Sequence, residues 1–227
     1  MRLVVLGSTG TAGGAVLQRC LATARVTSVR AISRRPLSFS HPKLRTFIHE
    51  DFLNYAPIRD AFVNADACLF CLGKSVSQVA DESAYRRITH DFAVAASAEL
   101  ASASPIAVFH YLSGQRASLS SRMMWARVKA ETERDLIASA GAVCWRPGFI
   151  DGADSASAPR GYQIIRPLFR LLRPFRSLYV AGEDIGRAMM QATLDGIRGR
   201  IIENREIRAI ADRFGRDEAR LASGAHS

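Results

Sequence analysis

A glycine-rich stretch near the N-terminus has the residue types and spacing to bind phosphate groups. It comprises Gly7, Ser8, Thr9, Gly10, Thr11, Ala12 and Gly13. The apolar run Arg2–Leu6 precedes it, and apolar residues at helical spacing follow it in 15–24. Glycines at three-residue intervals between a strand and a helix allow a tight turn, close backbone approach to a pyrophosphate and close helix packing. The pattern predicts a dinucleotide-binding loop; the alternative is a glycine-rich turn that binds no ligand.

Two arginines stand where the second strand is expected to end. In NAD-selective loops of this kind, an acidic residue at about this distance binds the ribose hydroxyls. Here Ser33 is followed by Arg34 and Arg35, with no carboxylate. Guanidinium groups bind phosphate through charge-assisted, often bidentate hydrogen bonds. We therefore expect NADP(H) to be favoured over NAD(H), the alternative being two solvated surface arginines.

The pair Asp51 and Phe52 follows the third expected strand. The carboxylate could accept a hydrogen bond from an adenine amino group while the phenyl ring packs against the base. The alternative is an aspartate that only closes a turn at the end of a strand.

Strands and helices alternate along most of the chain. Strands are expected at Arg2–Leu6, 26–32, Leu44–Ile48, 67–72, 107–112, 142–146 and 201–207, and helices at 15–24, 58–64, 82–100, 125–138 and 184–194. This alternation predicts an α/β fold, a doubly wound parallel sheet of the Rossmann type with helices on both faces. We expect one domain over 1–214, in which 150–214 form a small substrate or cover region, and a flexible tail over 215–227.

Composition excludes several classes of protein. The chain has 227 residues, of which 48% are hydrophobic and 23% charged, as in ordinary globular proteins. No apolar run is long enough to span a membrane, and the N-terminus lacks the pattern of a signal peptide. These features predict a cytoplasmic protein. The net charge of +10 arises from basic residues scattered along the chain, so a nucleic-acid partner is not favoured.

Cys68 and Cys71 have CxxC spacing, but they lie inside the apolar run 67–72. A redox pair normally opens a helix after a strand, and a structural zinc site needs further ligands at regular spacing. We therefore expect free, packed thiols and no metal.

Several motifs together give the chain a family resemblance. They are the glycine-rich loop, Cys71-Leu72-Gly73, Tyr111-Leu112-Ser113, Val128-Lys129-Ala130-Glu131 and Arg146-Pro147-Gly148. From Leu3 to about Phe214, the sequence resembles the atypical short-chain dehydrogenase/reductases, and within them the NAD(P)H-binding, NmrA-like family. The resemblance implies that Leu72, Gly73 and Lys74 lie against the cofactor. It also implies that Pro147 and Gly148 lie beside the nicotinamide.

The resemblance fails at one catalytic position. Short-chain dehydrogenases use a serine and a tyrosine placed four residues before a lysine, so that both side chains share a helix face. Ser113 and Lys129 match this pattern as catalytic residues, and Lys129 would also bind the cofactor ribose. The tyrosine position holds Trp125, whose indole donates a hydrogen bond but cannot exchange a proton near neutral pH. Trp125 is expected to shape the substrate pocket.

Neighbouring residues offer weak replacements for the missing acid. Tyr111 shares a side of its strand with Ser113 and is expected to point into the core. His110 points the opposite way and is expected to be packed or solvated.

A basic and apolar segment follows the last of these motifs. In 164–176, four apolar residues fall at helical spacing, and three arginines form another stripe. The favoured interpretation is a helix that covers the substrate pocket; docking to a membrane surface or a protein partner is less favoured.

Two functions of different classes remain. The first is an NADPH-dependent oxidoreductase acting on a small carbonyl or quinone-like acceptor. The second is a non-catalytic NADP(H)-sensing protein that acts through a regulatory protein partner. The loss of the tyrosine favours this second function. A sugar-nucleotide epimerase is a distant third, because that chemistry normally relies on the missing tyrosine.

Overall fold

A seven-stranded parallel sheet forms the centre of the molecule. The computed structural model describes residues 1–151 and 179–224. The strands are β1 (Arg2–Leu6), β2 (Ser28–Ser33), β3 (Leu44–Ile48), β4 (Ala67–Phe70), β5 (Val108–Leu112), β6 (Val143–Arg146) and β9 (Arg200–Glu203). Their order in the sheet is β3-β2-β1-β4-β5-β6-β9, and every neighbouring pair is parallel. The predicted doubly wound Rossmann-type sheet is confirmed.

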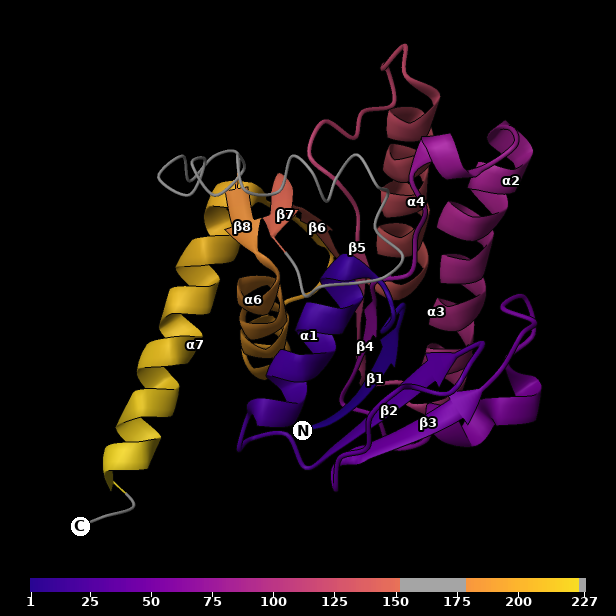
Figure 1. The fold of residues 1–227 in the computed structure, drawn as a ribbon. Helices are drawn as coiled ribbons and strands as arrows, with labels where there is room; N and C mark the ends of the chain where they lie inside the picture. Colours follow the sequence, from indigo (N-terminus) through magenta and orange to yellow (C-terminus); the bar gives the residue numbers. More distant parts are fainter. Residues whose placement is uncertain (152–178, 225–227) are drawn as a thin grey trace.

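Helices cover both faces of this sheet (Figure 1). One face packs against α1 (Thr11–Ala22), α6 (Gly182–Leu194) and α7 (Asn204–Gly224). The other packs against α3 (Phe92–Ala103) and α4 (Met124–Ala140). The shorter elements are the 3₁₀ helices η1 (Ala56–Ala61) and η2 (Val76–Gln78), helix α2 (Glu82–Arg86) and the π-helical turn η3 (Arg87–Asp91).

Strand β1 explains why the N-terminal run is apolar at successive positions. Leu3 and Val5 belong to the core on the α1 side, whereas Val4 and Leu6 belong to the core on the α3 side. Successive side chains of a strand point to opposite faces, so a strand covered on both faces has no solvent side for polar residues. β1 therefore ends deep inside the molecule, and the glycine-rich loop begins there.

The C-terminal part differs from the prediction. The last strand ends at Glu203, and α7 then runs from Asn204 to Gly224, where the rest of a strand and a flexible tail were expected. Ile207, Ile210 and Phe214 are buried at helical spacing, which is the signal that should have predicted a helix. A second parallel pair, β7 (Phe149–Asp151) with β8 (Tyr179–Ala181), was also not expected. The basic segment of 164–176 and its predicted cover helix lie outside the described residues.

Cys68 and Cys71 are packed, free thiols, as predicted. Cys68 is buried in β4 and Cys71 is half-buried just after it, both as free thiols. Burial raises the pKa of both thiols, so neither is a reactive thiolate. Across residues 1–151 and 179–224, the structure has no group of side chains arranged to hold a metal ion and no helix that could cross a membrane.

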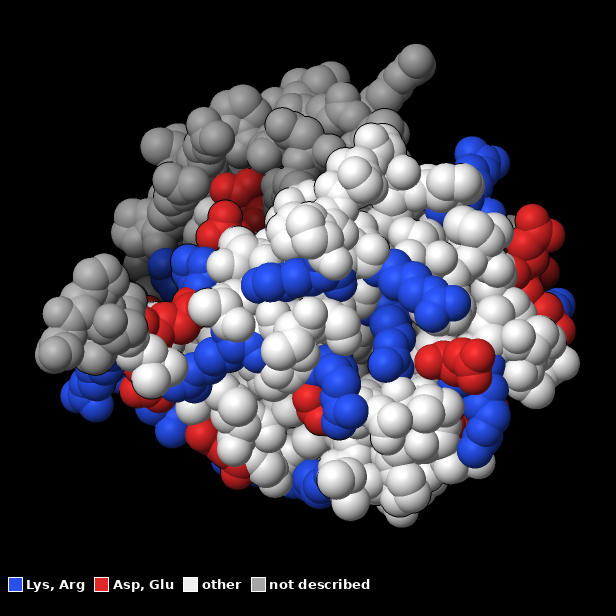
Figure 2. Space-filling model, turned by 90° about the horizontal axis from the view of Figure 1, so that it is seen from below, with Lys and Arg blue, Asp and Glu red and all other residues white. Residues whose placement is uncertain are grey.

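Charged side chains are mixed on the face that Figure 2 shows. Lysine and arginine side chains there lie among acidic and uncharged ones. The expectation that nucleic acid is not a partner stays a prediction.

Candidate functional site

Two positions of the glycine-rich loop, Gly7 and Gly13, have no room for a side chain. Gly7 has a φ of +81°, and a Cβ atom there would lie 2.6 Å from backbone atoms of Cys71 and Leu72. A Cβ atom on Gly13 would lie 2.2 Å from the Gly7 carbonyl oxygen. Gly10 donates its N–H to that same oxygen at 2.9 Å. The loop is therefore a tight turn between the ends of β1 and β4 and the start of α1.

The same loop has polar groups that can still bind a ligand. Gly10 caps α1 without a side chain, and no acidic residue lies in the first turn of the helix. The hydroxyl of Ser8 is buried and has no hydrogen-bond partner among the described residues. A buried hydroxyl without a partner costs free energy, and the N-terminus of a helix favours an anion. The cradle fits the pyrophosphate of a dinucleotide, and its residues are the ones the sequence predicts.

The two predicted phosphate-binding arginines follow β2 directly. Arg34 and Arg35 are both exposed, and neither has an acidic partner in the part of the chain that the structure describes. The backbone N–H of Arg35 donates to the Ser33 hydroxyl at 3.4 Å, closing the turn after the strand. β2 lies beside β1 in the sheet, so these cations follow the strand next to the one that ends in the glycine loop.

The predicted adenine contacts stay predictions. Asp51 is exposed and accepts a hydrogen bond from the Leu53 N–H at 3.1 Å, as in an aspartate turn. Phe52 is only 3% exposed and packs against Tyr55 and Phe92, with ring centroids 6.1 and 5.4 Å away. Phe52 is thus mainly a core residue, and little of its ring is free to pack against a base.

Ser113 and Lys129 meet at the end of β5. The Lys129 ammonium donates a hydrogen bond to the backbone carbonyl of Ser113 at 2.8 Å. Burial lowers the pKa of Lys129 to about 8, and the nearby Glu133 carboxylate opposes that shift. The Ser113 hydroxyl is buried and has no partner among the described residues. A cationic group therefore lies beside the backbone of the residue that carries this hydroxyl, and the catalytic roles of both residues stay predictions.

Trp125 lies in the first turn of α4, one helical turn before Lys129, and is half-buried. The neighbouring residues do not replace the missing tyrosine. The Tyr111 hydroxyl donates to the Thr89 carbonyl at 3.3 Å inside the core, where burial raises its pKa well above the usual range. His110 is fully buried on the other face of the sheet, and burial lowers its pKa to about 3.

A hydrogen-bonded frame holds the loop after β6 beside this pair. The Ser113 N–H donates to the Trp145 carbonyl at 2.8 Å, and the Gln115 N–H donates to the Pro147 carbonyl at 2.9 Å. The Gly148 N–H donates to the Asn204 side-chain oxygen at 2.7 Å. The structure thus brings Pro147 and Gly148 close to Ser113. Asn204 is a positioning residue that the sequence did not predict, because nothing marks an asparagine 56 positions downstream as a partner.

The residues predicted after β4 lie in an open stretch. A Cβ atom on Gly73 would meet no atom within 4 Å. Lys74 is exposed and Leu72 is half-buried. Their predicted contacts with a cofactor stay predictions.

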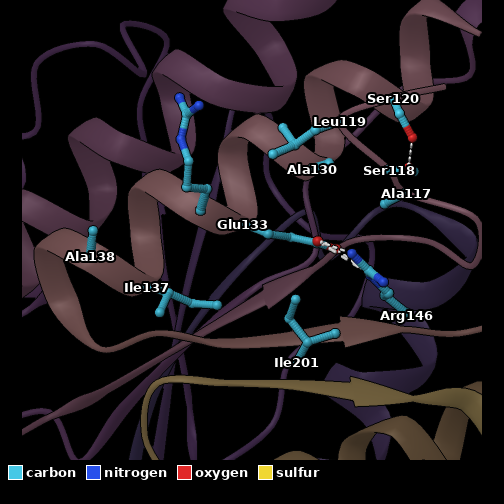
Figure 3. A pocket seen from close by; sticks show the side chains of 11 residues that line it. Ala117, Ser118, Leu119, Ser120, Ala130, Glu133, Ile137, Ala138, Arg146 and Ile201 are labelled. Atoms are coloured by element: carbon cyan, nitrogen blue, oxygen red, sulfur yellow. Dashed lines mark hydrogen bonds and ion pairs between the residues drawn. The ribbon is translucent and has the colours of Figure 1, made fainter. Parts of the chain in front are cut away.

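A groove of about 570 Å³ lies beside this site, along α4 (Figure 3). On its floor, Arg146 of β6 pairs with the buried carboxylate of Glu133 at 2.6 Å and with Glu203 at 3.0 Å. Glu133 lies one helical turn after Lys129, so the ion pair holds that part of α4 against the sheet. Ser113 and Lys129 do not line this groove, so Arg146 has a structural role here.

Comparison with known proteins supports the fold and corrects one prediction. No protein-family model matches the chain. The chain is 26% identical to the mitochondrial protein FMP52 of Eremothecium gossypii over 220 residues, covering 91% of this chain and 96% of that protein. It is 23% identical to the mitochondrial FMP52 of Candida albicans over 215 residues, covering 88% and 91%. These relatives are named as mitochondrial, so the prediction of a cytoplasmic protein is contradicted.

Solved structures resemble the fold at low sequence identity. WbmF of Bordetella bronchiseptica, solved with NAD⁺, superposes with a TM-score of 0.68 at 12% identity, covering 94% of this chain and 78% of that one. An oxidoreductase of the short-chain dehydrogenase/reductase family from Burkholderia thailandensis gives 0.66 at 15% identity, covering 89% and 90%. Uronate dehydrogenase from Agrobacterium tumefaciens gives 0.63 at 14% identity, covering 89% and 76%. The likeness establishes the shared α/β architecture.

Proposed function

We propose that this protein is an NADP(H)-dependent oxidoreductase that reduces a small carbonyl or quinone-like acceptor. The observation that carries the proposal is the buried Ser113 hydroxyl, which has no hydrogen-bond partner among the described residues and belongs to the residue that Lys129 contacts at the carboxyl edge of the sheet. In open α/β sheets, ligands bind outside the carboxyl ends of the strands, where these two groups and the glycine loop lie. The solved structures of similar fold include enzymes described as dehydrogenases and oxidoreductases, which agrees with the proposal.

Residues of this chain would hold the cofactor at two places. The backbone of the glycine loop, the N-terminus of α1 and the Ser8 hydroxyl bind the pyrophosphate. Arg34 and Arg35 bind the 2′-phosphate that distinguishes NADP(H) from NAD(H). When bound, such a cofactor supplies a hydride.

Ser113, Lys129 and Trp125 act on the acceptor and its surroundings. The Ser113 hydroxyl donates a hydrogen bond to the acceptor oxygen and stabilises the negative charge that develops there. The Lys129 ammonium has three N–H groups. One donates a hydrogen bond to the Ser113 carbonyl, and the others remain to donate to ribose hydroxyls. Trp125 forms a wall of the pocket and excludes water. Since the indole cannot release a proton, the product oxygen takes its proton from water, which favours strongly electrophilic acceptors such as quinones.

The tryptophan also favours a second candidate function. A protein that binds NADP(H) without turnover needs the loop, the arginines and Lys129, but no proton donor. Such a protein would respond to the cofactor and act through a protein partner. The two candidates share the cofactor site and differ only in turnover.

The decisive experiment measures cofactor affinity first and turnover second. NADPH and NADH are titrated by fluorescence against the wild-type protein and the double variant Arg34→Ala/Arg35→Ala. Loss of charge-assisted hydrogen bonds should weaken NADPH binding by about 1–3 kcal/mol, roughly 5- to 150-fold, and leave NADH nearly unchanged. The control is Arg216→Ala/Arg220→Ala, which removes two exposed arginines from the end of α7.

Two results would overturn the assignments. An equal loss of affinity for both cofactors would exclude Arg34 and Arg35 as the 2′-phosphate site. Tight NADPH binding without oxidation by any member of a quinone and aldehyde panel would replace the oxidoreductase by the cofactor-sensing protein.

A further inference from the structure

Arg116 occupies a backbone position that normally belongs to glycine. The Ala117 N–H donates to the Gly114 carbonyl at 3.2 Å, which closes a four-residue turn with Arg116 in third place. Arg116 has a φ of +74°, and it is one of two residues other than glycine with positive φ in the described chain. A positive φ at this position alone is typical of a type II turn, where glycine or asparagine avoids the strain that a Cβ atom causes. Strain of this kind gathers at functional sites.

The turn is fixed to the candidate active site on both sides of Arg116. Gln115 before it is bonded to the Pro147 carbonyl, and Ala117 after it is buried. A Cβ atom on Gly114 would lie 3.7 Å from the Lys129 ammonium nitrogen, so this turn runs directly along that cation. The position of Arg116 beside Ser113 and Lys129 is therefore determined by the frame and is not that of a free loop.

The guanidinium group of Arg116 is available to a ligand. The residue is exposed, and no acidic side chain among the described residues pairs with it. Glu133, the carboxylate one helical turn after Lys129, is already paired with Arg146, and Glu131 is paired with Arg86. The edge of the site thus has two cationic groups, Arg116 and Lys129, and neither forms an ion pair with a carboxylate in the part of the chain that the structure describes.

We propose that Arg116 binds an anionic group of the substrate, a carboxylate or a phosphate, so that the acceptor is an anionic carbonyl compound. This inference rests on the proposed function. The planar guanidinium group matches both anions through paired N–H donors. The cofactor phosphates are assigned to loops after β1 and β2, whereas Arg116 follows β5, and β4 separates β1 from β5 in the sheet. The anion at Arg116 therefore belongs to the substrate.

The test compares an anionic probe with a neutral one that differs from it by a single methyl group. Binding of para-carboxybenzaldehyde and of its methyl ester is measured by calorimetry, with and without saturating NADP⁺, which cannot reduce an aldehyde. A third probe, para-formylphenyl phosphate, distinguishes a phosphate site from a carboxylate site. The measurement needs no turnover, so it tests anion binding even in a protein that does not oxidise NADPH. The titrations without cofactor test it even if NADP⁺ does not bind.

The wild-type protein should bind at least one anionic probe about tenfold or more tightly than the ester. Arg116→Gly should remove that preference, leave the affinity for NADP⁺ unchanged and leave Tm unchanged or up to about 3 °C higher, because glycine relieves the positive φ. Asn64→Gly, at the other positive-φ residue, is the control for strain. Arg122→Ala removes an exposed arginine from the same connection between β5 and α4 and is the control for charge.

Four results would each overturn the proposal. They are a wild-type protein without preference for an anionic probe, an Arg116→Gly variant that keeps the preference, a variant that loses NADP⁺ affinity, and a variant whose Tm falls as binding is lost. The third would place Arg116 at the cofactor, and the last would give it a purely structural role.

Discussion

Replacing Gly7 by alanine should lower the free energy of unfolding for two reasons, the backbone conformation of the phosphate loop and the lack of space for a side chain there. The first is conformational: Gly7 has a φ of +81°, where an L-residue with a Cβ atom is strained by about 1 kcal/mol. The second is contact. The added Cβ atom would lie 2.6 Å from the carbonyl carbon and oxygen of Cys71 and from the Leu72 nitrogen. All three are backbone atoms at the end of a core strand, so overpacking should cost a further ~1–3 kcal/mol.

Two other glycines of the chain isolate each cost. Gly196 has a φ of +65° and open space around its Cβ position, so Gly196→Ala should lower the free energy of unfolding by only the conformational cost, about 1 kcal/mol. Gly73 also has open space and lacks a positive φ, so Gly73→Ala should change the free energy of unfolding by at most about 0.5 kcal/mol. Gly7→Ala should lower the free energy of unfolding by about 2–4 kcal/mol, because it meets both costs.

Urea denaturation followed by circular dichroism measures these free energies, with the slope against urea concentration checked for constancy. NADPH affinity, measured at a temperature where both proteins are folded, should fall for Gly7→Ala and stay unchanged for Gly196→Ala, which lies outside the predicted cofactor site. If Gly7→Ala were no more destabilising than Gly196→Ala, the close approach between the ends of β1 and β4 would be wrong. The reasoning about the cradle would then fail with it.

Two further predictions concern protons. His110 has its pKa lowered by burial from 6.5 to about 3, so the unfolded chain binds a proton that the folded chain does not. The free energy of unfolding should fall by about 1.5 kcal/mol between about pH 6.5 and pH 5, and His110→Asn should remove that part of the slope; parallel pH profiles would contradict it. Trp125→Tyr should raise aldehyde reduction about tenfold or more by restoring a proton donor four residues before Lys129, whereas Trp125→Phe should not. Equal rates for both variants would show that the missing proton donor does not limit reduction.

The sequence predicts the parts of this molecule that depend on local pattern. Short apolar runs that alternate with segments of helical spacing predicted the parallel sheet, and the glycine interval predicted the loop at Gly7. The pairing of Lys129 with Ser113 was also expected, because a family pattern places them together.

Other features depend on contacts between distant segments or on backbone angles, and no spacing encodes them. Asn204 bonds Gly148 only because α7 begins beside the loop after β6. The positive φ of Arg116 is visible only once the turn is closed. The helix after Glu203 was missed for a different reason: Ile207 was assigned to the strand predicted over 201–207, and the helical spacing of Ile210 and Phe214 beyond it was not used.

The hydrogen bond between Lys129 and residue 113 has a consequence for how this site can change. The lysine is held by a main-chain carbonyl, which every amino acid possesses, and not by the serine side chain. A different residue at 113 would leave the lysine anchored at the same distance. The hydroxyl proposed to contact the acceptor can therefore be replaced or lost while Lys129 keeps its position. The acceptor-binding part of the site can then diverge in sequence while the lysine remains in place.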